Sequence, residues 1–455
     1  MQLEYRRCCG MDVHKESVTA CLLLIDDDGE FRAEKRVYGT MTRDLQELAG
    51  WLKSQGADRI AMEATGVYWK PVWNILEAAG GFELLLVNAQ HVKNVPGRKT
   101  DQKDSEWLAD LLQHGLLRGS FVPPLEIRQL RDLTRMRTRV RQDLAKYANR
   151  IQKVLEDANI KLGTVASDVL GVSGRHMLKA LIAGQDDPKQ LADLARGRLR
   201  ARIEALELAL EGHFTGHHGF QLKTLFELLE FGEAQFNKLG IEIQRLITKL
   251  NAHAPMQAVA DETPGPEPEP EPLPLTPPLP LTPKSRLQTA VELLKTIPGV
   301  DELTASMLVA EIGANMDQFP GPHHLASWAG LCPGNNESAG KRRSGKIRKG
   351  SPWLRRGLCQ AAWAASRTKN TYLAALYRRL ITRKGKKRTI VAVAHTMLII
   401  AYHILKRGCP YQELGADYFD RLDAKGLQKR LVKKLTSLGF QVTLTPTAQP
   451  SPQSQ

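Results

Sequence analysis

Residues 8–39 read CCGMDVHKESVTACLLLIDDDGEFRAEKRVYG. Apolar and β-branched residues form runs in this stretch, and Asp-Asp-Asp-Gly at 26–29 interrupts them. A cluster of this kind is a turn signal between the two strands of a hairpin. The sequence therefore predicts that the chain begins with a β-hairpin.

Helices and strands are expected to alternate after this hairpin. The apolar spacing predicts helices at 41–55, 68–79 and 104–114, and short strands at 59–64 and 82–87. Strands that alternate with helices are typical of an α/β sheet covered by helices. We therefore predict an α/β domain at 1–124.

A different pattern begins at Leu125. Apolar residues recur every three or four positions from Ile127 to Val154, and again from about Leu222 to Leu250. This spacing is typical of long amphipathic helices that can pair in a coiled coil. We predict a helical coiled-coil domain at 125–255, with a simple helical bundle as the alternative.

The clearest domain boundary is the stretch TPGPEPEPEPLPLTPPLPLTP at 263–283. Proline fixes φ and removes a hydrogen-bond donor, so this stretch predicts a semi-extended spacer. We place a proline-rich linker at 256–285 and a mostly helical domain at 286–412. A basic helix and a polar tail are expected at 413–455.

The charge of the chain points to a polyanionic partner. The formal net charge is +15, and residues 338–412 contain 19 Lys and Arg but no Asp or Glu. Neutralising phosphates with such a segment releases counterions and stabilises binding, so we expect contact with nucleic acid. A merely soluble basic surface is the alternative.

The cysteines and the apolar segments of the sequence indicate the cellular compartment in which the protein is expected. The six cysteines include no C-x-x-C pair, which argues against a zinc site and a disulfide framework. The N-terminus lacks the apolar core of a signal peptide. The longest apolar run, 390–405, is too short to span a bilayer and contains His395 and His403. We expect a cytoplasmic protein with no membrane contact.

Four acidic residues in the first domain form a candidate metal site. Asp12 lies in the first predicted strand, Glu63 ends a later strand, and Asp101 and Asp104 lie three apart at the start of a helix. Four carboxylates in one pocket would repel one another unless cations intervened, and oxygen ligands suit Mg²⁺ or Mn²⁺. Two such ions can clamp the reacting oxygens of a phosphodiester. Any one of these acids alone is more often an ordinary surface charge, whereas the order of a strand Asp, a strand-end Glu and Asp-x-x-Asp on a helix is much rarer by chance.

A helix-hairpin-helix is expected at 293–313, LLKTIPGVDELTASMLVAEIG, with its tight turn at Ile297–Val300. Backbone N–H groups in such a turn can face a phosphate. Asp301 stands where the motif usually has a second glycine, so a hairpin that serves packing alone is equally compatible with the sequence.

A basic loop with three serines follows, before a helix expected at Trp353. Ser338, Ser344 and Ser351 lie in it. A serine hydroxyl is a weak nucleophile unless a neighbouring group activates it, so on residue chemistry these are phosphate-binding or simple loop residues. The basic residues expected to contact nucleic acid are Lys341, Arg342, Arg343, Lys346, Arg348, Lys349, Arg355 and Arg356.

Several motifs resemble one family. GMDVHK (10–15), AMEATGVYW (61–69) and GRKTDQKDSEWLADLL (97–112) resemble the RuvC-like DEDD domain of insertion-sequence transposases of the "IS one-ten" type. GLCPGNNESAGKRRSGKIRKGSPWLRR (330–356) resembles the C-terminal transposase domain of the same family. The resemblance runs from about 8 to 409, apart from the proline-rich stretch.

This resemblance implies a ribonuclease-H-like N-terminal fold with Asp12, Glu63, Asp101 and Asp104 as a metal-binding tetrad. It implies that Ser338 is the catalytic serine. The chain departs from the family pattern at Ala339, where glycine is common, and at Ser351, where asparagine is common.

The expected function is that of a DNA recombinase that cuts and rejoins donor and target DNA through a metal-assisted covalent phosphoserine. The resemblance also implies a non-coding bridge RNA as guide, a homo-oligomer (dimer or tetramer) and action in a prokaryotic nucleoid. Two alternatives remain open. One is a metal-dependent nuclease of branched, Holliday-junction-type DNA, which would have no use for Ser338. The other is a non-catalytic nucleic-acid-binding scaffold.

Overall fold

The computed structural model describes residues 4–25, 30–64, 66–88, 92, 104–252, 285–333, 336–338, 341–344, 347 and 350–444. These residues form two compact units, with the boundary between Arg128 and Gln129. The predicted linker at 256–285 lies almost wholly outside the described residues, and the division into five domains stays a prediction.

The first unit is built on a five-stranded mixed sheet. Its strands are β1 (Arg7–Val13), β2 (Ser17–Ile25), β3 (Phe31–Gly39), β4 (Arg59–Glu63) and β5 (Glu83–Val87). Their order is β3-β2-β1-β4-β5, with β2 antiparallel to β1 and β3, and with β1, β4 and β5 parallel. The strand order is consistent with the expected ribonuclease-H-like fold.

The predicted hairpin is confirmed as β2 and β3, whose last register pair joins Ile25 to Phe31. The Asp-Asp-Asp-Gly turn itself lies outside the described residues. The expectation of a single hairpin was incomplete, because Val13 also pairs with Val18 across a second, shorter turn. The stretch 8–39 therefore contributes to three strands, β1, β2 and β3.

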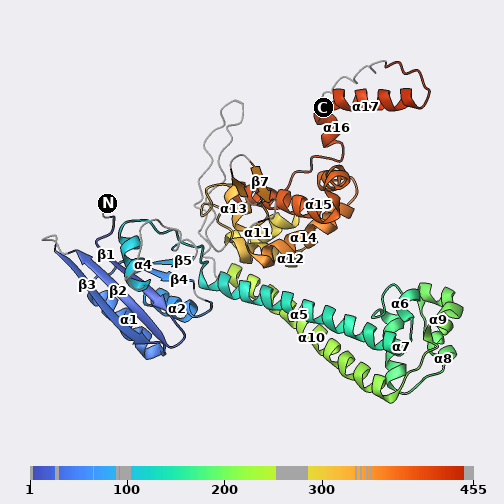
Figure 1. Cartoon of the computed structure of the whole chain (residues 1–455), viewed down its shortest axis with the longest axis horizontal. Helices are drawn as coiled ribbons and strands as arrows, with labels where there is room; N and C mark the ends of the chain where they lie inside the picture. The colour runs from blue at the N-terminus through green and yellow to red at the C-terminus, as the bar shows by residue number, and fades with distance from the viewer. Residues whose placement is uncertain are drawn as a thin grey trace, which may run out of the picture. The chain divides into compact units, whose positions relative to one another are not determined.

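Helices cover both faces of the sheet (Figure 1). Apolar residues of α1 (Thr42–Ser54) and α2 (Trp69–Ala79) pack with Cys9 and Met11 of β1 on one face. On the other face, Ala109 and Leu112 of α4 (Asp104–Gln113) pack with Cys8 and Ala61. Side chains two positions apart on a strand share a face, and this alternation decides where the acidic residues lie.

Two long helices form the first part of the second unit. α5 (Leu125–Asp157) and α10 (Gly216–Ala252) run antiparallel, since Leu130 clusters with Ile243 and Ile247. Farther along, the guanidinium of Arg137 lies 3.7 Å from the centre of the Phe236 ring. The long helices were predicted correctly, whereas a supercoiled coiled coil stays a prediction.

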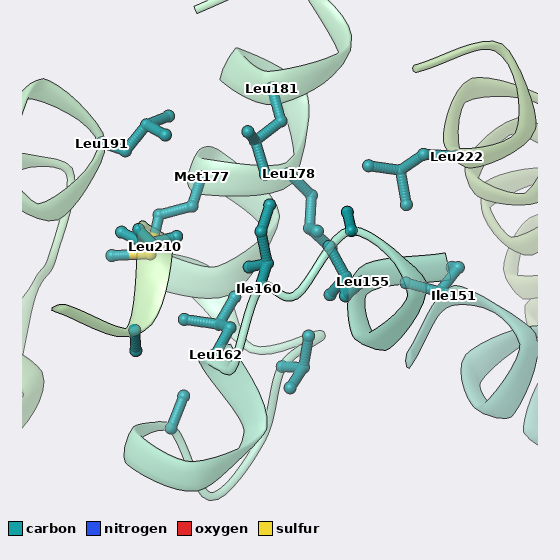
Figure 2. Packing of buried hydrophobic residues seen from close by; sticks show 14 of the residues in the cluster. Ile151, Leu155, Ile160, Leu162, Met177, Leu178, Leu181, Leu191, Leu210 and Leu222 are labelled. Carbon is teal, nitrogen blue, oxygen red and sulfur yellow. The ribbon is translucent and has the colours of Figure 1, made fainter. Parts of the chain in front are cut away.

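A compact core closes the far end of this helix pair. Ile151, Leu155 and Leu222 of the long helices are at most 2% exposed and pack with residues of the short helices between them (Figure 2). Burying each such side chain contributes roughly 1.5–3 kcal/mol. The short helices are α6 (Leu162–Val165), α7 (Val172–Ile182), α8 (Pro188–Asp193), η1 (Gly197–Arg202) and α9 (Ile203–Leu210).

The rest of the second unit is mostly helical, as expected. Its elements are α11 (Ser285–Lys295), α12 (Glu302–Ile312), α13 (Pro322–Trp328), β6 (Asn336–Ser338), β7 (Lys341–Ser344), α14 (Pro352–Arg367), α15 (Tyr372–Arg407), α16 (Tyr418–Leu422) and α17 (Ala424–Ser437). The region before α14 was expected to be loop, and the structure instead contains the antiparallel pair β6 and β7.

The turn between α11 and α12 packs against α14. Gly299 has a φ of +84°, and a Cβ there would lie 2.5 Å from the carbonyl oxygen of Ala361 and 2.6 Å from the amide nitrogen of Ala365. The Asp301 carboxylate accepts a hydrogen bond from the Thr304 N–H at 2.8 Å and so caps α12. Both contacts belong to packing and capping, and a phosphate contact by this hairpin stays a prediction.

α15 extends beyond the apolar run recognised in the sequence. By length and composition it is the one helix of the described residues that could cross a membrane, and half of its apolar window is buried inside the fold. Gly385, with a φ of +69°, interrupts the helix with a kink. Core helices of soluble folds meet the same criterion, so this helix alone is weak evidence for a membrane span.

Candidate active site

The ends of two parallel strands place Asp12 and Glu63. Met11 of β1 is in register with Met62 of β4, and the two acidic residues are the next residue in each strand. Gly10 and Ala61, two positions earlier, face α4. Because side chains alternate along a strand, Asp12 and Glu63 also lie on the α4 face, where both are half-buried.

The direction of α4 brings a third carboxylate to the same end of the sheet. Cys8 Sγ lies 3.7 Å from the carbonyl oxygen of Ala109. A Cβ on Gly10 would lie 2.4 Å from the carbonyl oxygen of Ser105. Moving along β1 toward its carboxyl end therefore means moving along α4 toward its N-terminus, where the exposed Asp104 lies. Ligands of α/β sheets bind at this carboxyl edge.

The fourth predicted carboxylate, Asp101, lies outside the described residues. Within the described ranges, no three His, Cys, Asp or Glu side chains form a group that could hold a metal ion. The fit to Mg²⁺ or Mn²⁺ therefore depends on donor type and placement. Asp12 and Glu63 lie on one face at the carboxyl edge of the sheet, Asp104 begins the helix that covers this face, and oxygen donors are the ligands these cations prefer.

Asp12 also has a neighbour that the sequence did not single out for a role. His14 Nε2 lies 3.1 Å from Asp12 Oδ2, and the His14 side chain is 64% exposed. This imidazole can orient the Asp12 carboxylate without burying it. The signal in the sequence was the polar pair His14-Lys15 directly after an apolar strand.

Gly10 is the residue that allows α4 to approach the sheet. A Cβ at this position would lie 2.3 Å from the amide nitrogen of Ala109, which is a backbone atom and cannot rotate away. We expect Gly10→Ala to lower the free energy of unfolding by about 1–3 kcal/mol, because overpacking must displace the helix. Chemical denaturation of the purified chain measures the change.

The matched control is Gly50→Ala in α1, where a Cβ would have nothing within 4 Å. Alanine there is expected to stabilise the helix by roughly 0.5–1 kcal/mol. Equal effects of the two substitutions would contradict the close approach of α4 to β1.

The second unit positions the backbone of Ser338. Ser338 is the last residue of β6, and its register partner is Lys341, the first residue of β7. A two-residue connection thus separates the serine from a strand of sequence KRRS. Among the predicted nucleic-acid contacts, Lys341, Arg342 and Arg343 belong to β7. Lys346, Arg348 and Lys349 lie outside the described residues, and Arg355 and Arg356 are in α14.

Ser351 has a structural role. Its Oγ accepts a hydrogen bond from the Leu354 N–H at 3.2 Å, which makes it the N-cap of α14. It also donates to Glu311 Oε2 at 3.1 Å. Serine and asparagine are both strongly preferred N-caps, so the departure from the family pattern at this position preserves the cap.

The buried acid Glu311 was not recognised in the sequence. Its side chain is 1% exposed and receives two hydrogen bonds from Arg135 of α5, Nε to Oε1 at 2.7 Å and Nη2 to Oε2 at 2.9 Å. Arg131, one turn earlier, donates to the backbone carbonyls of Ala310 and Glu311 at the end of α12. These contacts join the long helix α5 to the segment that leads to Ser338. The only signal was an acid inside the apolar run LVAEIG.

The sheet has the strand order β3-β2-β1-β4-β5 and carries carboxylates at the carboxyl ends of its parallel strands. This arrangement is typical of the ribonuclease-H-like class. Two family models match the chain. One, for DEDD transposases of the IS110 type and described as a transposase, matches residues 9–160; the other, described as transposase IS116/IS110/IS902 family, matches residues 291–378. The chain belongs to the IS110 family of transposases.

Part of the chain is also similar to curated proteins whose names describe gene inversion. The pilin gene-inverting proteins of Moraxella bovis and Moraxella lacunata are each 29% identical to the chain over 130 residues. The match covers 28% of this chain and 40% of each relative. Since less than half of the relatives' length is matched, their similarity supports the family and leaves the activity of this chain to be proposed.

Proposed function

We propose that this chain is a DNA recombinase that cuts and rejoins donor and target DNA. The observation that carries the proposal is the placement of Asp12 and Glu63 on one face at the carboxyl edge of the sheet, with Asp104 at the N-terminus of the helix that covers this face. Membership of a transposase family supports the same reaction class. The names of the Moraxella relatives, which state that they invert a gene, agree with it.

Ser338 is the proposed nucleophile. Its Oγ attacks the scissile phosphorus, the Oγ–P bond forms, and the P–O bond to one DNA strand end breaks. The serine proton is released, and the departing oxygen takes up a proton. The reverse attack by another DNA end restores the phosphodiester and frees the serine, so bond energy is conserved during strand exchange.

The four carboxylates Asp12, Glu63, Asp101 and Asp104 are the proposed ligands of Mg²⁺ or Mn²⁺. When bound, such cations stabilise charge on the reacting oxygens of a phosphodiester. Independently of the cation, basic residues near Ser338 bind the DNA backbone and hold the strand in place. We extend the proposal to a bridge RNA that selects the DNA by base pairing, and to a homo-oligomer acting in the prokaryotic cytoplasm.

Denaturing gel analysis of labelled DNA incubated with the chain tests this proposal. We expect a protein-linked DNA species from the parent chain and none from Ser338→Ala. Ser344→Ala, in the neighbouring strand, is the matched control and is expected to retain the species. DNA cleavage without any protein-linked species in the parent would contradict the proposal and favour a metal-dependent nuclease.

A further inference from the structure

A recess of about 900 Å³ lies within the second unit, among α5, α10, α12 and α14. It is formed entirely by residues after Gln129 and contains none of the four proposed metal ligands and not Ser338. Its volume falls within the range of ligand-binding sites in proteins, roughly 300–1,000 Å³.

One face of α5 supplies a polar wall. Thr134, Arg137, Thr138 and Arg141 line the recess, spaced three or four residues apart and therefore on one side of the helix. α14 contributes Arg356 and Trp353 to the lining. Three guanidinium groups thus surround one recess.

The two acids of the recess, Asp301 and Glu233, form no charge-assisted pair with these guanidinium groups, because their hydrogen bonds go elsewhere. Asp301 accepts the capping hydrogen bond from Thr304, and Glu233 accepts a hydrogen bond from Arg175 at 2.5 Å. No acidic side chain of the described part of the chain is hydrogen-bonded to Arg137, Arg141 or Arg356. Burial and the neighbouring Arg141 lower the pKa of Arg137, while Asp301 partly offsets them. An anion would relieve this repulsion.

Two donors in the wall have no acceptor. Arg137 Nε and Gln142 Nε2 are buried and lack a hydrogen-bond partner among the described residues. A buried donor without an acceptor costs about 1–3 kcal/mol. The guanidinium carbon of Arg137 lies over the Phe236 ring, and this cation–π contact helps to hold the side chain in place. The three guanidinium groups that line the recess favour a ligand with several acceptor oxygens.

We propose that this recess binds a phosphate and the attached nucleoside of an unpaired nucleic-acid strand. The choice of nucleic acid as ligand rests on the proposed function. The charge and shape of the recess are observed independently of that function. A duplex presents its phosphates on a stiff rod and cannot enter a recess of this volume. An unpaired strand bends, and its bases stack on aromatic rings and guanidinium planes such as Trp353 and Arg356.

Fluorescence anisotropy with the full chain tests the proposal. The probes are a short unstructured DNA strand, the RNA strand of the same sequence, and duplex DNA, each at two salt concentrations. The double variant Arg137→Gln and Arg141→Gln is expected to bind unpaired strands about tenfold or more weakly, since two charge-assisted contacts are lost. The salt slope is expected to fall by about 0.7 per contact. Tighter binding of RNA or of DNA identifies the source of the strand.

The matched control is Arg150→Gln with Lys153→Gln. It removes two exposed charges from the same helix, outside the recess, and is expected to change the affinity less than twofold. Asn237→Glu, which adds an acid to the exposed α10 wall, is a second variant and is expected to weaken binding. Thermal unfolding monitored by circular dichroism verifies that each variant is folded.

Equal losses in the two double variants, an equal loss of duplex binding, or no loss in the recess variants would overturn the proposal. Displacement of the strand by inorganic phosphate as effectively as by unlabelled strand would also overturn it, since the recess would then recognise the free ion. Failure of the proposed function would give a different result. The covalent protein–DNA species would then be missing, while unpaired strands would still bind to the recess.

Discussion

Asp12→Asn is expected to lower the rate of DNA strand cleavage by about a thousandfold or more. The substitution keeps the shape of the side chain but removes its charge at the carboxyl end of β1, beside the strand that ends in Glu63. A cation of the proposed site would contribute several kcal/mol to the reaction, and each 1.36 kcal/mol corresponds to about tenfold in rate. Single-turnover cleavage of labelled DNA measures the loss.

Glu47→Gln is the matched control for this prediction. Glu47 is an exposed acid of α1, which covers the opposite face of the sheet. We expect its neutral variant to cleave DNA at the parent rate. A similar rate for Asp12→Asn and Glu47→Gln would show that the charge of Asp12 has no part in the reaction.

The largest expected loss of stability comes from Glu311→Ala. The substitution removes the partner of Arg135 and of Ser351 from a position that is 1% exposed. Breaking a buried ion pair from one side destabilises a protein by about 3–5 kcal/mol. Arg135 is 31% exposed and can regain some hydration, so we expect a value near about 3 kcal/mol. Urea denaturation measures it.

Two further variants define the origin of this loss. Glu302→Ala removes an exposed acid from the first turn of α12 and is expected to cost about 0.3–1 kcal/mol through the helix dipole. Arg135→Ala combined with Glu311→Ala leaves no unpaired charge, so the double variant should lose less than the two single losses added together. Strict additivity would mean that the two side chains do not interact.

The elements of the first unit could be predicted closely from the sequence because their apolar patterns are strong. The strand Arg59–Glu63 and the helix Asp104–Gln113 were each predicted to within one residue. The strands β6 and β7 could not be recognised in the same way. Their residues NES and KRRS are polar throughout, so no alternation of apolar and polar side chains marks them.

The candidate site was predictable in part. The positions of Asp12 and Glu63 at strand ends follow from the local pattern, whereas their common face depends on a register that only the folded sheet provides. The recess and the Arg135–Glu311 pair were missed because their residues come from helices far apart in the chain. The sequence shows Arg135 only as one of many charges on an amphipathic helix.

The central claim is that Asp12, Glu63, Asp101 and Asp104 bind divalent cations together. A crystal structure of the chain grown with Mn²⁺, with anomalous diffraction collected to locate the ion, tests it most directly. We predict an anomalous peak within coordinating distance of carboxylate oxygens from β1, β4 and the start of α4. An ordered structure in which these carboxylates point to separate surfaces, with no manganese among them, would contradict the account.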